Sequence, residues 1–550
     1  MEPTLSNEKQ DGRIGRTSSA SNYKWKVLFS VVFGTFMVIL DSTAVNVAIP
    51  TLQRVFKAPV DQVDSVLTAY VLALGIVTPL AGYLSERFGI KRLYLVALGL
   101  FVCGSVLCGF APSLLWLIFF RALQGLGGGI LGPLGIALLF GAFPEKERGL
   151  AFGLYGIPLV VAPASGPVLG GYFVQYLNWR YIFFINLPIS LLGIVLAGFW
   201  LRENRRGSSA RLDVPGVLLS TVSFGVLLYA IQQGANDGWG SIRIISLLII
   251  GIITLLVFIV VELRAKEPLL NLRLFGRRAF ACASIIGWVS TIALFGAEFL
   301  LPIYLQSLRG RTPLEAGLLV LPLAISAGVI TPLAGAFYNK LGGRWLIFIG
   351  SILLAFNTWE LAHLTTETSY LEIMGIVAVR GIALGLILQT TLTAALTGLL
   401  PAQLPRASSL LSATRNVFQS FGIAVLGAIL TNQLTNAQNT ALSALHNPLT
   451  ALGQQFVKLT QALQQSGLSL AAANQAAAAQ LLGSAYPQWF VQALNDAYTV
   501  TFWMALLTAL LALTLPGRVR SRQNVGATEE ATALTEDVQP LSAQTGEALL

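Results

Sequence analysis

The stretch Thr78-Pro79-Leu80-Ala81-Gly82 decides the fold, because it returns unchanged at residues 331–335. The residues that follow each copy also correspond, at the same offset of 253 positions. The further pairs are Gly89 with Gly342, Arg87 with Lys340, and Lys91 with Arg344. Such a match indicates an internal duplication, so we expect two halves of similar structure.

The sequence around both copies is strongly apolar. Of its 550 residues, 55% are hydrophobic and 11% are charged, whereas a soluble globular protein carries about 25% charged residues. A bilayer core about 30 Å thick requires about 20 apolar residues per helix, and runs of this length follow one another. They predict an all-α polytopic membrane protein with 14 transmembrane helices. The predicted spans are 27–49, 63–84, 93–112, 114–141, 150–175, 181–201, 213–233, 243–263, 279–301, 314–338, 345–364, 371–398, 407–432 and 495–515.

Charged residues between the spans set the predicted orientation. With a cytoplasmic amino terminus, 25 Lys and Arg lie in inward segments, 7 in outward segments and 3 inside spans. Positive charge concentrates on the cytoplasmic side, so both termini are predicted to be cytoplasmic. The first 26 residues are polar, so we expect the first apolar run to be retained rather than cleaved as a signal peptide. The net charge of +10 is dispersed between spans, which predicts lipid headgroup contacts and no nucleic acid partner.

The duplication predicts how the spans are grouped. Its two copies end the second and the tenth span, and a shift of eight spans preserves orientation. If each repeat has six helices, two more stand between the halves, giving a 6+2+6 arrangement. The predicted units are a cytoplasmic tail at 1–26, an N-terminal six-helix bundle at 27–201, two inserted helices at 213–263, a C-terminal six-helix bundle at 279–515, and a cytoplasmic tail at 516–550.

One long outward segment, residues 433–494, is rich in Ala, Gln and Asn. Apolar residues recur within it at spacings of three and four, which predicts a short amphipathic helix. They are Leu449, Leu452, Phe456, Leu459 and Leu463. We favour the interpretation that this helix lies over the protein's own outer surface. The alternative is that it docks an outer adaptor protein through a helical hairpin of that partner.

The residues after the first copy of the repeat resemble the signature of the major facilitator superfamily, whose two halves are parallel repeats. The matching residues are Gly82, Glu86, Arg87, Gly89 and Lys91. The acidic position is usually Asp and is Glu86 here. The resemblance implies the major facilitator fold, and it implies that this loop holds the halves together in one state. The acidic residue is then expected near a helix amino terminus of the opposite half, where the helix dipole favours negative charge.

Three further motifs resemble the fourteen-helix drug:proton antiporter branch of this superfamily. They are residues 40–50, residues 178–188, and the antiporter motif with Gly166, Pro167 and Gly170. On their own, the two glycines of the antiporter motif predict close helix packing, and its proline predicts a weakened helix ladder. The resemblance, which covers about residues 25–515, implies export.

The candidate proton-coupling residues are Asp41, Glu298 and Arg121. Arg121 begins a run similar to the intramembrane arginine motif of proton-coupled members. A charge at the bilayer centre costs about 2.5–3.5 kcal/mol on insertion scales, so it normally faces a cavity or a partner. A carboxylate in a low dielectric binds a proton more readily and can exchange it for a cationic substrate. An arginine that only ties helices together, and an interfacially solvated Glu298, are the alternatives.

Polar and aromatic side chains are the candidates for the substrate cavity. They are Asn46, Gln124, Tyr155, Trp288 and Phe295. Aromatic rings can stack on flat or cationic compounds, although in spans they also serve as packing residues.

The predicted function is therefore proton-coupled antiport by alternating access, with multidrug efflux of small amphipathic or cationic compounds across the plasma (inner) membrane. A dedicated exporter of a metabolite, peptide or siderophore is an alternative, as is a non-transporting receptor or scaffold. We expect no enzyme activity, because no nucleotide-binding loop or catalytic constellation is present. The three cysteines have no metal-ligand spacing, so we expect no metal and no cofactor, and the proton gradient supplies the energy.

Overall fold

The computed structural model describes residues 8–203, 213–445, 447 and 449–516, and all regular secondary structure within them is helical. Twelve helices in these ranges are long and apolar enough to cross a membrane, and the bent pair α2 and α3 gives a thirteenth. The predicted all-α membrane fold is thereby confirmed. The predicted tail at 516–550 lies almost entirely outside the described residues.

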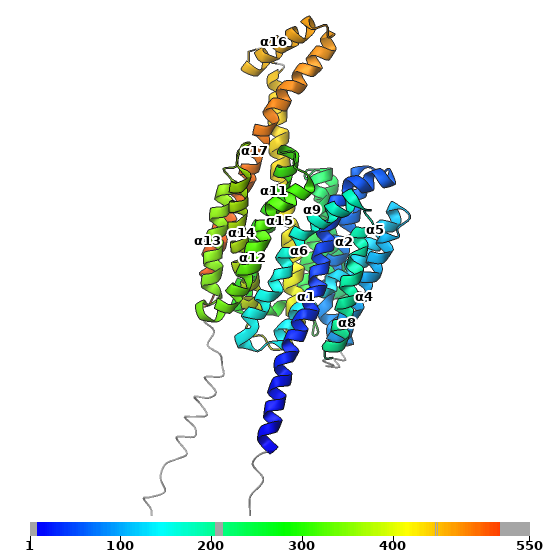
Figure 1. Cartoon of the computed structure of the whole chain (residues 1–550), viewed down its shortest axis with the longest axis vertical. Helices are drawn as coiled ribbons and strands as arrows, with labels where there is room; N and C mark the ends of the chain where they lie inside the picture. The colour runs from blue at the N-terminus through cyan, green and yellow to red at the C-terminus, as the bar shows by residue number, and fades with distance from the viewer. Residues whose placement is uncertain (1–7, 204–212, 446, 448, 517–550) are drawn as a thin grey trace, which may run out of the picture.

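The helices follow one another in simple order (Figure 1). Up to residue 203 they are α1 (Glu8–Phe56), α2 (Val60–Val77), α3 (Leu80–Phe88), α4 (Ile90–Gly109), α5 (Leu114–Ala142), η1 (Glu145–Glu147), α6 (Arg148–Tyr176), α7 (Tyr181–Phe184) and α8 (Asn186–Trp200). Then come α9 (Val214–Asp237), α10 (Ile242–Arg264), η2 (Leu272–Gly276), α11 (Arg278–Ile303), η3 (Tyr304–Leu308), α12 (Pro313–Leu341), α13 (Gly343–Leu361), α14 (Tyr370–Leu396), α15 (Leu404–Leu445), α16 (Ala451–Gln465) and α17 (Leu470–Ala512).

Each predicted span overlaps a helix, but two spans are broken. The span predicted at 63–84 consists of α2 and α3, which meet at an angle of 57°. Pro79 lies at this break, and a proline removes one hydrogen bond of the helix ladder. The span predicted at 181–201 is divided into α7 and α8. α13 occupies the span predicted at 345–364, yet its composition is too polar for it to count among the twelve apolar helices.

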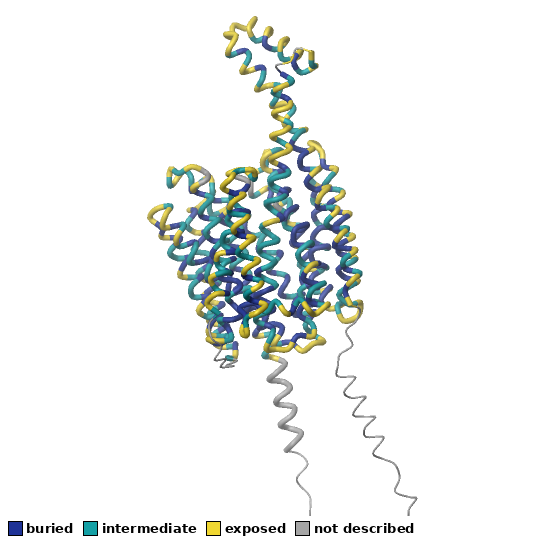
Figure 2. Tube along the Cα trace, turned by 180° about the vertical axis from the view of Figure 1, so that it is seen from behind, coloured by how far each residue is buried: buried dark blue, intermediate teal, exposed yellow. Residues whose placement is uncertain are grey.

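The outer segment differs from its prediction. The amphipathic helix is confirmed as α16, but α15 and α17 continue far beyond their apolar spans and carry it (Figure 1). α16 packs against these two helices at the tip of a projecting hairpin, which is largely exposed (Figure 2). The interpretation that it lies over the protein's own outer surface is therefore wrong. The polar residues of the segment are compatible with helix, and hydropathy alone does not report where such a helix ends.

α1 begins and α17 ends at the side of the bundle opposite α16, which we call the terminal end (Figure 1). The inserted pair lies at the edge of the bundle, where α9 packs against α2 and α15. Its partner α10 is the more exposed helix, with 17% of its apolar stretch buried. Exposed apolar side chains on a membrane protein meet lipid, so α10 is suited to face the bilayer.

The repeated stretch lies where the two halves of the chain meet. In the first copy, a Cβ atom on Gly82 would lie 2.7 Å from the Pro405 carbonyl oxygen on α15. In the second, a Cβ atom on Gly335 would lie 2.0 Å from the Gly149 carbonyl oxygen on α6. Both glycines thus allow backbones of opposite halves to touch at the terminal end.

Because no side chain fits at this contact, Gly335→Ala should destabilise the protein. The new Cβ atom would overlap Gly149, and overpacking of this kind costs about 1–3 kcal/mol. We expect a lower melting temperature for the purified protein in detergent. Gly328→Ala on the same helix is the matched control, since nothing lies within 4 Å of its Cβ position. Equal melting temperatures for the two variants would contradict this packing.

Candidate functional site

The centre of the first half is the carboxylate of Asp41, which is buried on α1. Arg121 Nη1 on α5 donates a hydrogen bond to Asp41 Oδ2 at 2.5 Å. Gln124 Nε2 and Asn186 Nδ2 donate to Asp41 Oδ1 at 3.0 and 2.7 Å. The carboxylate therefore has one charged and two neutral donors, which offset the cost of burying it.

A second layer of contacts holds these donors in place. Arg121 Nη1 also donates to Gln124 Oε1 at 2.9 Å, and its guanidinium lies 4.1 Å from the centre of the Tyr70 ring. Asn186 Nδ2 donates to Ser105 Oγ at 2.9 Å. The network therefore joins α1, α2, α4, α5 and α8 around one charge pair.

Some polar atoms of this network remain available. Arg121 Nε and Nη2 and Asn186 Oδ1 are buried and have no hydrogen-bond partner among the described residues. An unsatisfied buried polar group costs about 1–3 kcal/mol. The site can therefore accept a further polar group, or can rearrange when the charge on Asp41 changes.

Glycines of α5 bring the neighbouring helices close enough for these contacts. A Cβ atom on Gly125 would lie 2.4 Å from the Tyr70 carbonyl oxygen on α2. On α4, a Cβ atom on Gly104 would lie 2.7 Å from the backbone nitrogen of Gln124. Small residues at such contacts allow helix backbones to approach closely in a membrane.

The predicted antiporter motif lies directly beside Asp41. A Cβ atom on Gly166 would lie 2.0 Å from Thr43 Oγ1, and one on Gly170 would lie 2.6 Å from the Ala44 carbonyl oxygen. The same helix, α6, packs along α12 of the second half. The motif thus joins the helix of Asp41 to the contact between the halves.

The predicted signature residues lie at the terminal end. Arg406 Nη2 donates to Glu86 Oε2 at 2.7 Å, and Arg406 lies in the first turn of α15, which begins at Leu404. The acidic residue therefore lies at a helix amino terminus of the other half, as the resemblance implies. Gly89 has a φ of 91°, which favours glycine. In the same turn Lys91 Nζ donates to the Gly198 carbonyl oxygen at 2.6 Å, and Arg87 Nη1 donates to Tyr83 Oη at 3.4 Å.

Glu298 is not part of the Asp41 network. It lies on α11, where it interacts electrostatically with the buried Arg380 of α14. Arg380 also donates to the Leu294 carbonyl oxygen and, at 3.4 Å, to Asn357 Oδ1. Sequence reasoning gave Arg380 no role. The repeat contains a signal for it, because Leu294 follows Asp41 at the same offset of 253.

The predicted substrate-cavity residues are divided between several places. Gln124 belongs to the Asp41 network, and Thr35 Oγ1 donates to Tyr155 Oη at 3.1 Å. Asn46 is exposed and takes no part in these contacts.

Trp288 lines a hollow of about 60 Å³ between α5, α11, α14 and α15, which Arg415 also lines. The Trp288 ring stacks on Phe418, with centroids 4.9 Å apart, and Phe295 lies 5.5 Å from the Arg415 guanidinium. Ligand pockets typically measure about 300–1,000 Å³. A drug-sized substrate therefore requires the halves to move apart.

No group of three or more His, Cys, Asp or Glu side chains is placed to hold a metal ion in the described ranges. The cysteines differ in exposure: Cys108 is buried, Cys282 is half-buried and Cys103 is exposed.

Comparison with known proteins identifies the family. The model of the Major Facilitator Superfamily matches residues 31–427, so the chain belongs to this superfamily of transporters. It is 33% identical over 415 residues to the multidrug resistance protein B homolog of Mycobacterium tuberculosis, covering 74% of this chain and 76% of the relative. It is 35% identical over 422 residues to the uncharacterized MFS-type transporter YhcA of Bacillus subtilis, covering 76% and 79%.

The solved structure of the proton:xylose symporter XylE matches with a TM-score of 0.58 at 15% identity, covering 90% of this chain and 96% of that one. This likeness shows the shared fold. The chain is a multi-span membrane transporter of small molecules, and its family and fold are not those of enzymes.

If the Asp41–Arg121 pair acts as a unit, its two members should be strongly coupled in stability. Arg121→Gln and Asp41→Asn each leave one buried charge unpaired, and breaking a buried pair costs about 3–5 kcal/mol. The double variant should lose less than the sum of the single losses, since neither charge then lacks its partner. Thermal unfolding of the purified variants measures this coupling.

The exposed pair Arg243 and Asp237, 2.9 Å apart, provides the control cycle. Surface pairs contribute about 0–1 kcal/mol. Additive losses at Asp41 and Arg121, or coupling no larger than in the control, would contradict the proposed unit.

Proposed function

We propose that this transporter is a proton-coupled antiporter of the fourteen-helix drug:proton branch, which exports small amphipathic or cationic compounds. The observation that carries the proposal is the buried Asp41 carboxylate, which is paired with Arg121 and lies beside the glycines of α6. Because α6 also packs on α12, a change at Asp41 can reach the contact between the halves. Relatives named as multidrug resistance proteins favour the same substrate class.

In the proposed cycle, one proton is exchanged for one substrate molecule. Protonation of Asp41 removes the negative charge that Arg121 faces, so it weakens the link between α1 and α5. A cationic substrate favours the ionised carboxylate, so its binding releases the proton. The proton and the substrate therefore occupy the site alternately, while Arg121 keeps the site polar in both states.

The driving force depends on the charge that moves. One unit of pH difference supplies about 1.4 kcal/mol per proton, and 100 mV supplies about 2.3 kcal/mol per net charge. Exchange of one proton for one monocation moves no net charge and uses the pH gradient alone. A neutral substrate would add the membrane voltage.

We extend the proposal to the topology. α13 and the bent pair α2 and α3 would join the twelve apolar helices as spans, giving fourteen in a 6+2+6 grouping. The excess of Lys and Arg in the predicted inward segments places both termini in the cytoplasm, with the protein in the plasma (inner) membrane.

Transport of a cationic dye by inverted vesicles tests the mechanism. Wild-type protein should accumulate the dye up to about tenfold per unit of imposed pH gradient. Asp41→Asn should abolish this accumulation, because an amide cannot carry the exchanged proton. Glu298→Gln should reduce it if the second half holds a further proton site. Glu367→Gln, an exposed acid between α13 and α14, is the control and should transport normally.

Normal gradient-driven transport by both Asp41→Asn and Glu298→Gln would refute the site assignment. Proton release from the purified protein on dye addition distinguishes an antiporter from a receptor. A dedicated exporter would instead release protons only with its own metabolite, peptide or siderophore.

The projecting hairpin remains the candidate surface for an outer adaptor protein. If it serves only a partner, deletion of residues 440–485 should leave dye transport in vesicles unchanged while lowering efflux from intact cells. Unchanged efflux in both assays would argue against an adaptor, and loss in both would assign the hairpin a role in transport itself. Melting temperature of the deletion variant controls for folding.

A further inference from the structure

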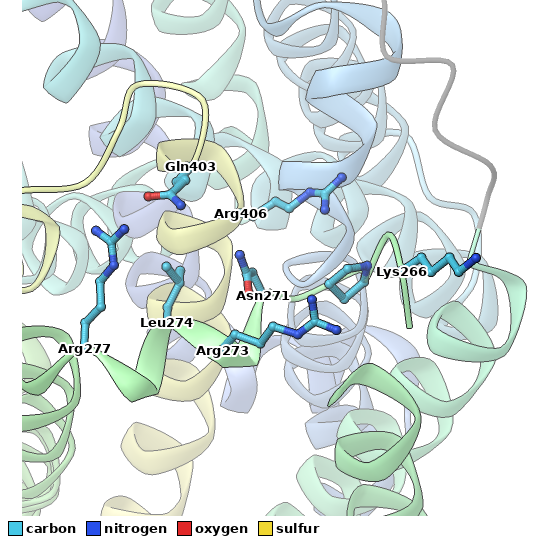
Figure 3. A pocket seen from close by; sticks show the side chains of 8 residues that line it. Lys266, Asn271, Arg273, Leu274, Arg277, Gln403 and Arg406 are labelled. Carbon is cyan, nitrogen blue, oxygen red and sulfur yellow. The ribbon is translucent and has the colours of Figure 1, made fainter. Parts of the chain in front are cut away.

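A hollow of about 320 Å³ lies between the linker that joins α10 to α11 and the start of α15. Figure 3 shows six of its lining residues: Lys266, Asn271, Arg273 and Arg277 from the linker, with Gln403 and Arg406 across from them. α10 ends at Arg264 and α11 begins at Arg278, so the hollow lies level with the ends of two apolar helices. Such a position corresponds to the boundary between bilayer and water.

The hollow is basic, because four of its lining residues are cationic. The acids paired with them are Glu86 and Glu267, which contact Arg406 at 2.7 and 3.3 Å. Two positive charges therefore remain in excess of the two carboxylates.

The linker cations carry this excess. In the described part of the chain, Lys266, Arg273 and Arg277 form no ion pair. Arg273 donates to backbone carbonyl oxygens of the linker region, and Arg277 Nη1 donates to the Gly398 carbonyl oxygen at 3.2 Å. These bonds orient the guanidinium groups without neutralising them.

Two buried atoms of the hollow lack a partner. The Arg406 side chain is 12% exposed, and its Nε has no hydrogen-bond partner among the described residues. Asn271 Oδ1 is in the same situation. A buried guanidinium nitrogen without an acceptor is unfavourable, so Arg406 is prepared to bind an anion through Nε while Nη2 stays on Glu86.

We propose that this hollow binds a phosphate group. The planar fork of an arginine matches phosphate oxygens, and Lys266 adds a point charge. Two sources share this chemistry: the headgroup of an anionic phospholipid and a soluble phosphorylated compound. The position at the bilayer boundary favours the lipid. A bound phosphate ties the linker to Arg406, and hence to the Glu86 contact between the halves.

Native mass spectrometry of the full-length protein tests this site, with phosphatidylglycerol and inorganic pyrophosphate as separate probes and phosphatidylcholine as the zwitterionic reference. Arg273→Gln/Arg277→Gln should weaken binding about tenfold or more, since each basic residue contributes separately to attraction. Lys266→Gln, whose side chain has no hydrogen bond in the described ranges, should weaken it several-fold. Arg92→Gln/Arg202→Gln is the control, because it removes two exposed charges at the same end but outside the hollow.

Selective loss of phosphatidylglycerol binding in the double variant identifies a lipid site, and loss of pyrophosphate binding identifies a soluble ligand. Either result supports the proposal. It is overturned if neither probe binds the wild-type protein, or if the variants and the control bind like wild type. Melting temperatures verify folding, and if the double variant does not fold, Lys266→Gln decides. The outcome is independent of dye transport, so it can fail without affecting the proposed antiport.

Discussion

The pairing of Asp41 with Arg121 is the interaction on which the arrangement of the first half depends. Both side chains are fully shielded from solvent, and an isolated charge in such surroundings is too costly to persist. Gln124, Asn186 and Tyr70 therefore have to converge on the pair from different helices. Glycines on α4, α5 and α6 permit that convergence, since any larger residue would separate the backbones. Packing and electrostatics are thus two aspects of one constraint.

The second half repeats this arrangement without repeating its chemistry. Arg380 is buried as Arg121 is, yet it donates to a backbone carbonyl oxygen at Leu294, where the first half presents the Asp41 carboxylate. The acid of the second half, Glu298, lies one helical turn further along α11. Two related arginines therefore face different acceptors. Such divergence allows one half to carry a tightly held charge pair while the other keeps a looser one.

The contact between the halves follows the same duplication. Each copy of the repeated stretch places a glycine against a helix of the opposite half, α15 in one case and α6 in the other. These are also the helices that bear Arg406 at the signature loop and the glycines beside Asp41. The contact between the halves therefore adjoins both the charge pair and the basic hollow. A rigid-body movement of the halves would change all three together, which is the behaviour expected of alternating access.

Hydropathy, charge and repetition determined by themselves that the chain spans a membrane as two related halves, and they singled out Asp41 and Arg121 as buried charges that need a reason. Bilayer physics acts on composition, so these features can be read without coordinates. Only the tertiary structure decided that Asp41 and Arg121 are partners, that Glu298 belongs with Arg380, and that α15 and α17 extend into a projecting hairpin. Pairing depends on which helix faces which, and residues 80 positions apart are brought together only by packing. The hairpin is helical because Ala, Leu and Gln favour helix wherever it lies, so its sequence carried no mark of where the membrane ends.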